Sequence, residues 1–116
     1  MSKAYKDLVV WQKAMDLVIK IYKLTDNFPK SELFGLTNQI RRSVVSIPSN
    51  ISEGKMRLSD QEFKRFLKIA YASASELQTQ LEISRRLKMG NLKEYLEIEN
   101  LLIEVLKMLN RLIYSI

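Results

Sequence analysis

The sequence predicts an all-α protein: a single domain, residues 1–116, folded as an antiparallel up-down-up-down four-helix bundle. Apolar residues recur at spacings of three and four along four segments, which is the period of a helix face. Only 3 glycines and 2 prolines occur in 116 residues, and most of them separate these segments. The alternation typical of β-strands is missing except at Val44-Val45. Short connections make neighbouring helices antiparallel.

The first helix is predicted at about residues 8–25, with Asp7 as its N-cap. Its core-facing stripe is Val10, Ala14, Leu17, Ile21 and Leu24. From Leu8 to Leu24, 12 of 17 positions are apolar, whereas an outer helix of a monomeric bundle needs one apolar stripe. Unusually complete coverage by the neighbouring helices would explain this excess, but we favour a subunit interface. The candidate interface residues are Trp11, Val18 and Tyr22.

The second helix is predicted at residues 32–53, with Gly54 as the residue that stops it. Its stripe is Leu36, Ile40, Val44, Ile47 and Ile51. Pro48 lies inside this helix, where a missing N–H and a ring clash kink or split the structure. A kink is favoured because the apolar period resumes in register after the proline.

The third helix is predicted at residues 60–89. Ser59 as N-cap, followed by Glu62, forms a capping box directly before the apolar run. The spacing then alternates between four and three, as in the helices of bundles. The stripe is Phe63, Leu67, Ala70, Ala74, Leu77 and Leu81.

The fourth helix is predicted at residues 92–115. Gly90 suits the left-handed residue that ends the preceding helix, and Asn91 with Glu94 forms a second cap. The stripe is Tyr95, Ile98, Leu102, Val105, Leu109 and Leu112.

The composition argues against an enzyme. Histidine and cysteine are both absent, so the commonest acid–base group, the commonest metal ligand and all thiolate chemistry are missing. The three glycines are isolated and form no phosphate-binding loop. We therefore expect no catalytic residues, no metal and no cofactor. We also expect a cytoplasmic protein without a membrane partner, because no signal-peptide core and no apolar run of about 18 residues is present.

A polar seam runs beside the apolar stripes of the second and third helices. Its members are Gln39, Arg42, Ser46, Asn50, Glu53, Ser73, Glu76 and Gln80. An antiparallel pair that turns near residue 57 brings together positions whose numbers sum to about 114. This register predicts a buried contact between Arg42 and Glu76. We interpret the seam as a structural feature that fixes helix pairing or a subunit contact; a ligand site is the alternative.

Most of the net charge of +6 gathers at one end of the predicted bundle. The topology brings ten cations there: Lys3, Lys6, Lys13, Lys55, Arg57, Lys64, Arg65, Lys68, Lys107 and Arg111. Five anions accompany them, namely Asp7, Glu53, Asp60, Glu62 and Glu104, which leaves +5 at this end. Clustered cations suit nucleic-acid phosphates or an acidic protein surface. The candidate nucleic-acid-binding residues are Lys3, Lys6, Lys55, Arg57, Lys64, Arg65 and Lys68. The nearest aromatic residues, Phe63 and Phe66, are predicted to be core.

Six stretches of the sequence carry a family resemblance. The most specific is Ser-Ile-Pro-Ser-Asn-Ile at residues 46–51. The others are residues 7–14, 28–36, 39–43, 52–54 and 75–81. Together they resemble the four-helix bundle proteins encoded in intervening sequences of bacterial 23S rRNA genes. The resemblance implies an antiparallel four-helix bundle, a homopentamer and an association with RNA, and it carries no catalytic residues.

A related branch of this family resembles the accessory proteins of diversity-generating retroelements. Those proteins pair with a reverse transcriptase and bind nucleic acid through a basic surface. Two functions are therefore expected. The first is a non-enzymatic basic scaffold associated with RNA or ribosomes; the second is a protein-interaction module, such as a reverse-transcriptase accessory subunit, that holds an acidic protein.

Overall fold

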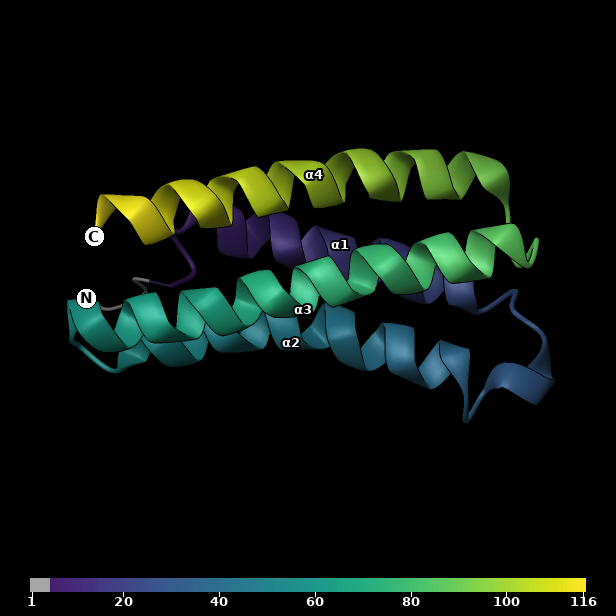
Figure 1. Ribbon diagram of the computed structural model, residues 1–116, viewed down its shortest axis with the longest axis horizontal. Coiled ribbons are helices and arrows are strands. Elements are labelled where there is room, and N and C mark those ends of the chain that lie inside the picture. Colours follow the sequence, from purple (N-terminus) through teal and green to yellow (C-terminus); the bar gives the residue numbers. More distant parts are fainter. Residues whose placement is uncertain (1–4) are drawn as a thin grey trace.

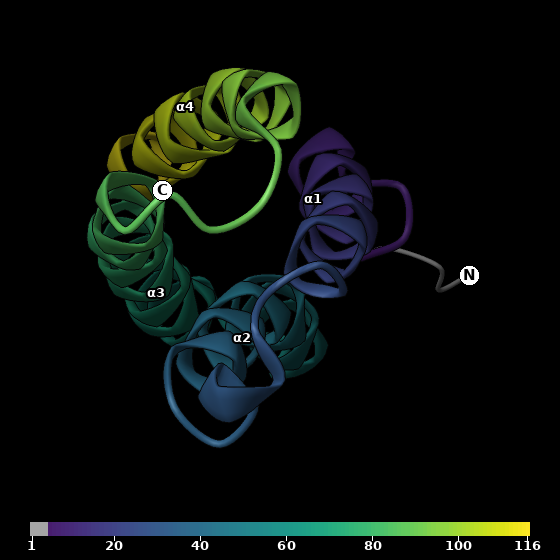
Figure 2. The ribbon, with the colours of Figure 1, turned by 90° about the vertical axis from the view of Figure 1, so that its right-hand side faces the viewer.

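The predicted up-down four-helix bundle is confirmed by a computed structural model, which describes residues 5–116. Its helices are α1 (Val9–Thr25), α2 (Leu36–Met56), α3 (Asp60–Arg86) and α4 (Leu92–Ser115), with a short 3₁₀ turn, η1 (Lys30–Glu32), between α1 and α2. The helices lie along one long axis (Figure 1). Viewed along that axis they form a ring, in which each helix packs against its sequence neighbour and α4 closes onto α1 (Figure 2).

The core lies inside this ring and consists of the four predicted apolar stripes. Every stripe residue is buried except Leu36 and Leu112, which are partly exposed. Phe28 in the α1–α2 connection and Phe66 on α3 are also buried, at 6% and 8% exposure. The periodicity of the sequence was therefore a sound guide to which residues face inward.

The boundaries of α2 differ from the prediction at both ends. The helix begins at Leu36 rather than at residue 32, because η1 intervenes and the Glu32 carboxylate accepts a hydrogen bond from the Leu36 N–H at 3.1 Å. It also continues past Gly54, so the prediction that Gly54 stops the helix is wrong. A Cβ at Gly54 would lie 2.5 Å from the Cβ of Phe66. The glycine therefore allows α2 and α3 to approach closely.

Pro48 does not split α2. The proline is buried within the helix, which runs without interruption from Leu36 to Met56. The chain reverses direction after the helix at Leu58, which has a φ of 60° and is 92% exposed. A bulky residue rarely adopts this left-handed conformation, and the sequence pattern did not predict it.

Ser59 and Asn91 are confirmed as N-caps, but the return bonds of the predicted capping boxes are not observed: Glu62 accepts from Arg65, and Glu94 Oε1 has no partner within residues 5–116. Ser59 Oγ accepts from the Glu62 N–H at 3.2 Å, and Asn91 Oδ1 accepts from the Lys93 N–H at 2.8 Å. The predicted Asp7 cap is wrong: the residue before α1 is Leu8, whose side chain offers no acceptor. The third helix ends at Arg86, three residues earlier than predicted. Lys88 and then Gly90 turn the chain with φ of 59° and 79°.

Within residues 5–116, no helix combines the length and the apolar character needed to cross a membrane.

Candidate nucleic-acid interface

The start of α1, the α2–α3 turn and the end of α4 lie at the same end of the bundle (Figure 1). We call this the basic end, because nine of the ten cations of the predicted cluster lie on or next to these segments. Lys3 falls outside the described residues. Some of the other nine form ion pairs or lie over aromatic rings within the protein, and some do not. This difference decides which of them remain available to a ligand.

Arg57 and Arg65 are both engaged by the protein itself. Each guanidinium stacks on the ring of Phe66, at 5.0 Å and 4.5 Å from its centroid. Arg57 also pairs with Glu53 at 2.9 Å, and Arg65 pairs with Glu62 at 3.1 Å. The hydrogen bond from Arg65 lowers the pKa of the Glu62 carboxyl below its usual value. These two arginines therefore add less to the field outside the protein than the sequence suggested.

Lys55 and Lys6 lie over aromatic rings. The Lys55 ammonium is 5.0 Å from the centroid of Phe63, and the Lys6 ammonium is 6.0 Å from that of Tyr5. Phe63 is 7% exposed, which confirms the prediction that it belongs to the core. A lysine in this position keeps its ammonium group in water while its stem covers apolar surface.

Of the remaining five cations of the basic end, one forms an ion pair and four do not. Lys13 pairs with Glu104 at 3.0 Å across the α1–α4 boundary. In contrast, Lys64, Lys68, Lys107 and Arg111 form no ion pair with any residue in the described part of the chain. Lys68, Lys107 and Arg111 are exposed and Lys64 is half-buried. These four side chains are the best candidates for contacts with an anionic ligand.

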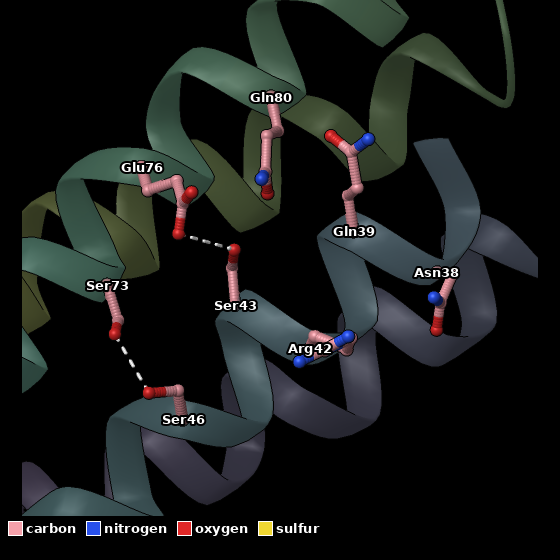
Figure 3. A pocket seen from close by; sticks show the side chains of 8 residues that line it. All are labelled: Asn38, Gln39, Arg42, Ser43, Ser46, Ser73, Glu76 and Gln80. Atoms are coloured by element: carbon pink, nitrogen blue, oxygen red, sulfur yellow. Dashed lines mark hydrogen bonds between the residues drawn. The ribbon is translucent and has the colours of Figure 1, made fainter. Parts of the chain in front are cut away.

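The polar seam connects α2 to α3 through side-chain hydrogen bonds (Figure 3). Ser46 Oγ and Ser73 Oγ lie 2.8 Å apart, and Asn50 donates to Ser46 Oγ at 2.9 Å. Ser43, which the sequence analysis did not include, donates to the Glu76 carboxylate at 3.2 Å. Ser43 could have been identified from the sequence, because its hydroxyl group lies directly beside Val44 of the apolar stripe.

The predicted pairing of Arg42 with Glu76 is wrong. Both side chains are exposed, and Glu76 is bonded to Ser43 instead. The cause is the direction of the side chains: Ser43 is buried and bonded to α3, whereas its neighbour Arg42 is exposed. The register also differs from the prediction, since the observed pairs, 43 with 76 and 46 with 73, each sum to 119 rather than 114. α2 continues beyond Gly54, so the turn pivots two to three residues later than predicted.

The other seam residues do not form one network. Gln39 is exposed, and Glu53 belongs to the basic end through its pair with Arg57. Gln80 is 8% exposed, and its Oε1 atom has no hydrogen-bond partner within residues 5–116. Gln39 and Gln80, together with Arg42 and Glu76, line an open groove of about 370 Å³ (Figure 3).

A second apolar face of α1 turns away from the core. Of the predicted interface residues, Trp11 and Val18 are half-buried against the core, and Tyr22 is 39% exposed beneath the Arg41 guanidinium at 4.5 Å. Met15 and Ile19, which were not among the predicted interface residues, lie on the same face and are 39% and 54% exposed. The signal that could have identified them is their spacing, because Trp11, Met15 and Ile19 follow one another at intervals of four residues along the helix.

Comparison with known proteins identifies a family and a similar solved structure. The family model described as 23S rRNA-intervening sequence protein matches residues 6–111. The crystal structure of a protein of unknown function from the S23 ribosomal protein family of Bacteroides thetaiotaomicron is similar to this chain, with a TM-score of 0.83 and 30% identity. The match covers 91% of this chain and 96% of that one. No curated protein matches. The chain belongs to the 23S rRNA-intervening sequence protein family.

Proposed function

We propose that this protein is a non-enzymatic scaffold that binds nucleic-acid phosphates through its basic end. The observation that carries the proposal is the group of Lys64, Lys68, Lys107 and Arg111, none of which is paired with a carboxylate of the described chain. Lysine and arginine side chains that are free of internal partners release counterions from a phosphate backbone and so supply affinity. The family's name, which refers to intervening sequences of 23S rRNA, makes RNA the first ligand to test.

We also propose that subunits assemble through the second apolar face of α1. Met15, Ile19 and Tyr22 each leave more than a third of their surface exposed there. An exposed apolar face of this kind suits a partner subunit. A homopentamer, as the family resemblance implies, would repeat the basic end five times, so that a weak contact at one subunit becomes a tight one for the ring.

The test is a mobility-shift titration with a structured RNA over a series of salt concentrations. The informative variant is Lys64→Gln/Lys68→Gln, which removes two unpaired charges of the basic end. Its matched control is Lys23→Gln/Lys30→Gln, which removes two exposed charges near the opposite end. The proposal expects a loss of affinity only in the first variant. Equal affinity in all three proteins would refute it.

A second candidate function is the binding of an acidic protein, such as a reverse transcriptase, at the same end. Met56 and Leu58 favour it, because they are 61% and 92% exposed and lie among the cations of the α2–α3 turn. An apolar centre with a charged rim suits a protein surface better than a phosphate backbone. A neighbouring reverse-transcriptase gene would favour this function, whereas a position within an rRNA operon would favour the first.

A further inference from the structure

We infer that the nucleic acid bound by this protein is single-stranded and lies across α3 and α4, with its bases stacked on Tyr71 and Tyr114. The inference rests on the proposed function, because it uses the same unpaired cations. It adds the strandedness of the ligand, the path that it follows and two aromatic residues that the charge pattern alone does not single out.

The two helices carry matching triads of side chains. On α3 the triad is Lys64, Lys68 and Tyr71, and on α4 it is Lys107, Arg111 and Tyr114. In both, two cations and a tyrosine fall at positions i, i+4 and i+7, which share one face of a helix. Each triad spans about 10 Å along its helix. The basic end therefore presents cations and aromatic rings together.

The tyrosine of the first triad faces the boundary between the two helices. Tyr71 lies 14 residues, or two heptads, before Arg85, so both are on one stripe of α3. Arg85 pairs with Glu99 of α4 at 2.7 Å, which fixes this stripe on the α4 side. Midway along it, Gln78 lines a surface groove together with Glu99.

The second triad lies level with the first. The α3–α4 contacts Arg85–Glu99 and Ser84–Tyr95 join residues whose numbers sum to 184 and 179. By this register Tyr114 lies level with residues 65–70 of α3 along the bundle axis, and Arg111 of the same triad borders α1, where it lines a groove with Leu8 and Val9. The two tyrosines are thus within about two helical turns of each other along the bundle axis.

Tyr71 and Tyr114 have no internal role that would explain them. Tyr95 is 1% exposed and donates to Ser84 at 2.7 Å, and the ring of Tyr22 lies against Arg41. By contrast, Tyr71 is 37% exposed and Tyr114 is 79% exposed. Neither forms a side-chain hydrogen bond or a ring contact with the other residues of the 5–116 region.

This combination favours an unpaired strand over a duplex. A duplex offers phosphates but keeps its bases stacked inside, so the tyrosine rings would gain nothing from it. A single strand offers phosphates to the lysines and free base faces to the rings, as in other single-strand-binding surfaces. Two acids lie near the triads: Asp60 is one turn before Lys64, away from Tyr71, and Glu104 is one turn before Lys107 and is paired with Lys13. The ligand class is therefore single-stranded RNA or DNA with little sequence preference.

The experiment measures fluorescence anisotropy of a labelled oligouridine and of an RNA duplex of the same length. Tyr71→Leu and Tyr114→Leu remove the rings and keep apolar bulk, whereas Tyr71→Phe and Tyr114→Phe keep the rings and serve as controls. Thermal melts confirm that each variant is folded. Because stacking on an aromatic ring changes affinity by about five- to one-hundred-fold per base, we expect a loss of about tenfold for each leucine variant.

The outcomes separate this inference from the proposed function. Tighter binding of oligouridine than of duplex, a loss in the leucine variants, full binding in the phenylalanine variants and an unchanged salt dependence would support it. Leucine variants that bind like the wild type, while Lys64→Gln/Lys68→Gln loses affinity, would overturn it and leave the proposed function intact. If the wild type binds neither RNA, the proposed function fails, and the inference fails with it.

Discussion

Replacing Gly54 with alanine tests how closely α2 and α3 pack. In an isolated helix this change is favourable by about 1 kcal/mol, because alanine is the better helix former. Here the new Cβ would lie 2.5 Å from the Cβ of Phe66 and 3.3 Å from Phe63. A Cβ is fixed by its own backbone and cannot rotate away, so the two helices must move apart. Overpacking of this kind costs about 1–3 kcal/mol, and two rigid contacts place Gly54 toward the upper part of that range.

We therefore expect Gly54→Ala to reduce the free energy of unfolding by about 1–2 kcal/mol despite its higher helix propensity. The assay is urea denaturation followed by circular dichroism, with an unchanged m-value as evidence of an intact fold. Ser49→Ala is the matched control, since Ser49 is an exposed residue of the same helix. It should change stability by less than about 0.5 kcal/mol. A Gly54→Ala protein as stable as this control would refute the close approach of α2 and α3.

Three further predictions follow from particular side chains. Burial raises the pKa of Tyr95, so the folded state holds the phenol proton more tightly than the unfolded state. The contribution of Tyr95 to stability should thus be constant below about pH 10 and fall above it; in denaturation at several pH values, Tyr95→Phe should lose this fall and should cost about 1 kcal/mol at neutral pH. Arg42→Ala and Glu76→Ala should be additive within about 0.5 kcal/mol in a double-mutant cycle, and a larger coupling would restore the pairing that the structure excludes. Ile19→Glu should weaken subunit assembly in light scattering, because a charge in a desolvated interface is costly; an unchanged mass would place the interface elsewhere.

The fold was predictable because its determinants are local and repeated. Each stripe needs only a spacing of three and four, and errors at single positions do not change which face is buried. The caps at Ser59 and Asn91 were predictable for the same reason, since a hydrogen bond to a backbone N–H two or three residues away depends on the nearby sequence alone.

The predictions that were wrong concern contacts between helices, which depend on residues far apart in the sequence. Gly54 has the sequence context of a helix stop, and only its distance to Phe66 on another helix reveals that it serves packing. Glu76 was assigned to Arg42 instead of Ser43 because the sequence does not show which of these two neighbours is exposed and which is bonded to α3. The left-handed turn at Leu58 was also missed, because no residue of the usual type marks it.

The candidate interface was predictable only in outline. Net charge and bundle topology placed the cations at one end, but they did not show that Arg57 and Arg65 are held by carboxylates and by Phe66. Those contacts depend on rotamers and on the shape of the turn. The exposed tyrosines were not identified for a similar reason, because exposure is a property of the packed molecule.

The most direct test of the proposed function is the salt dependence of RNA affinity in wild type and in Lys64→Gln/Lys68→Gln. A phosphate-binding basic end predicts a linear fall of log affinity with log salt concentration, with a slope of about 0.7–0.9 for each phosphate neutralised. The variant should bind more weakly at low salt and show a slope smaller by about 1.4–1.8 per subunit engaged. Affinity that does not depend on salt, or identical slopes in the two proteins, would contradict phosphate binding at this end.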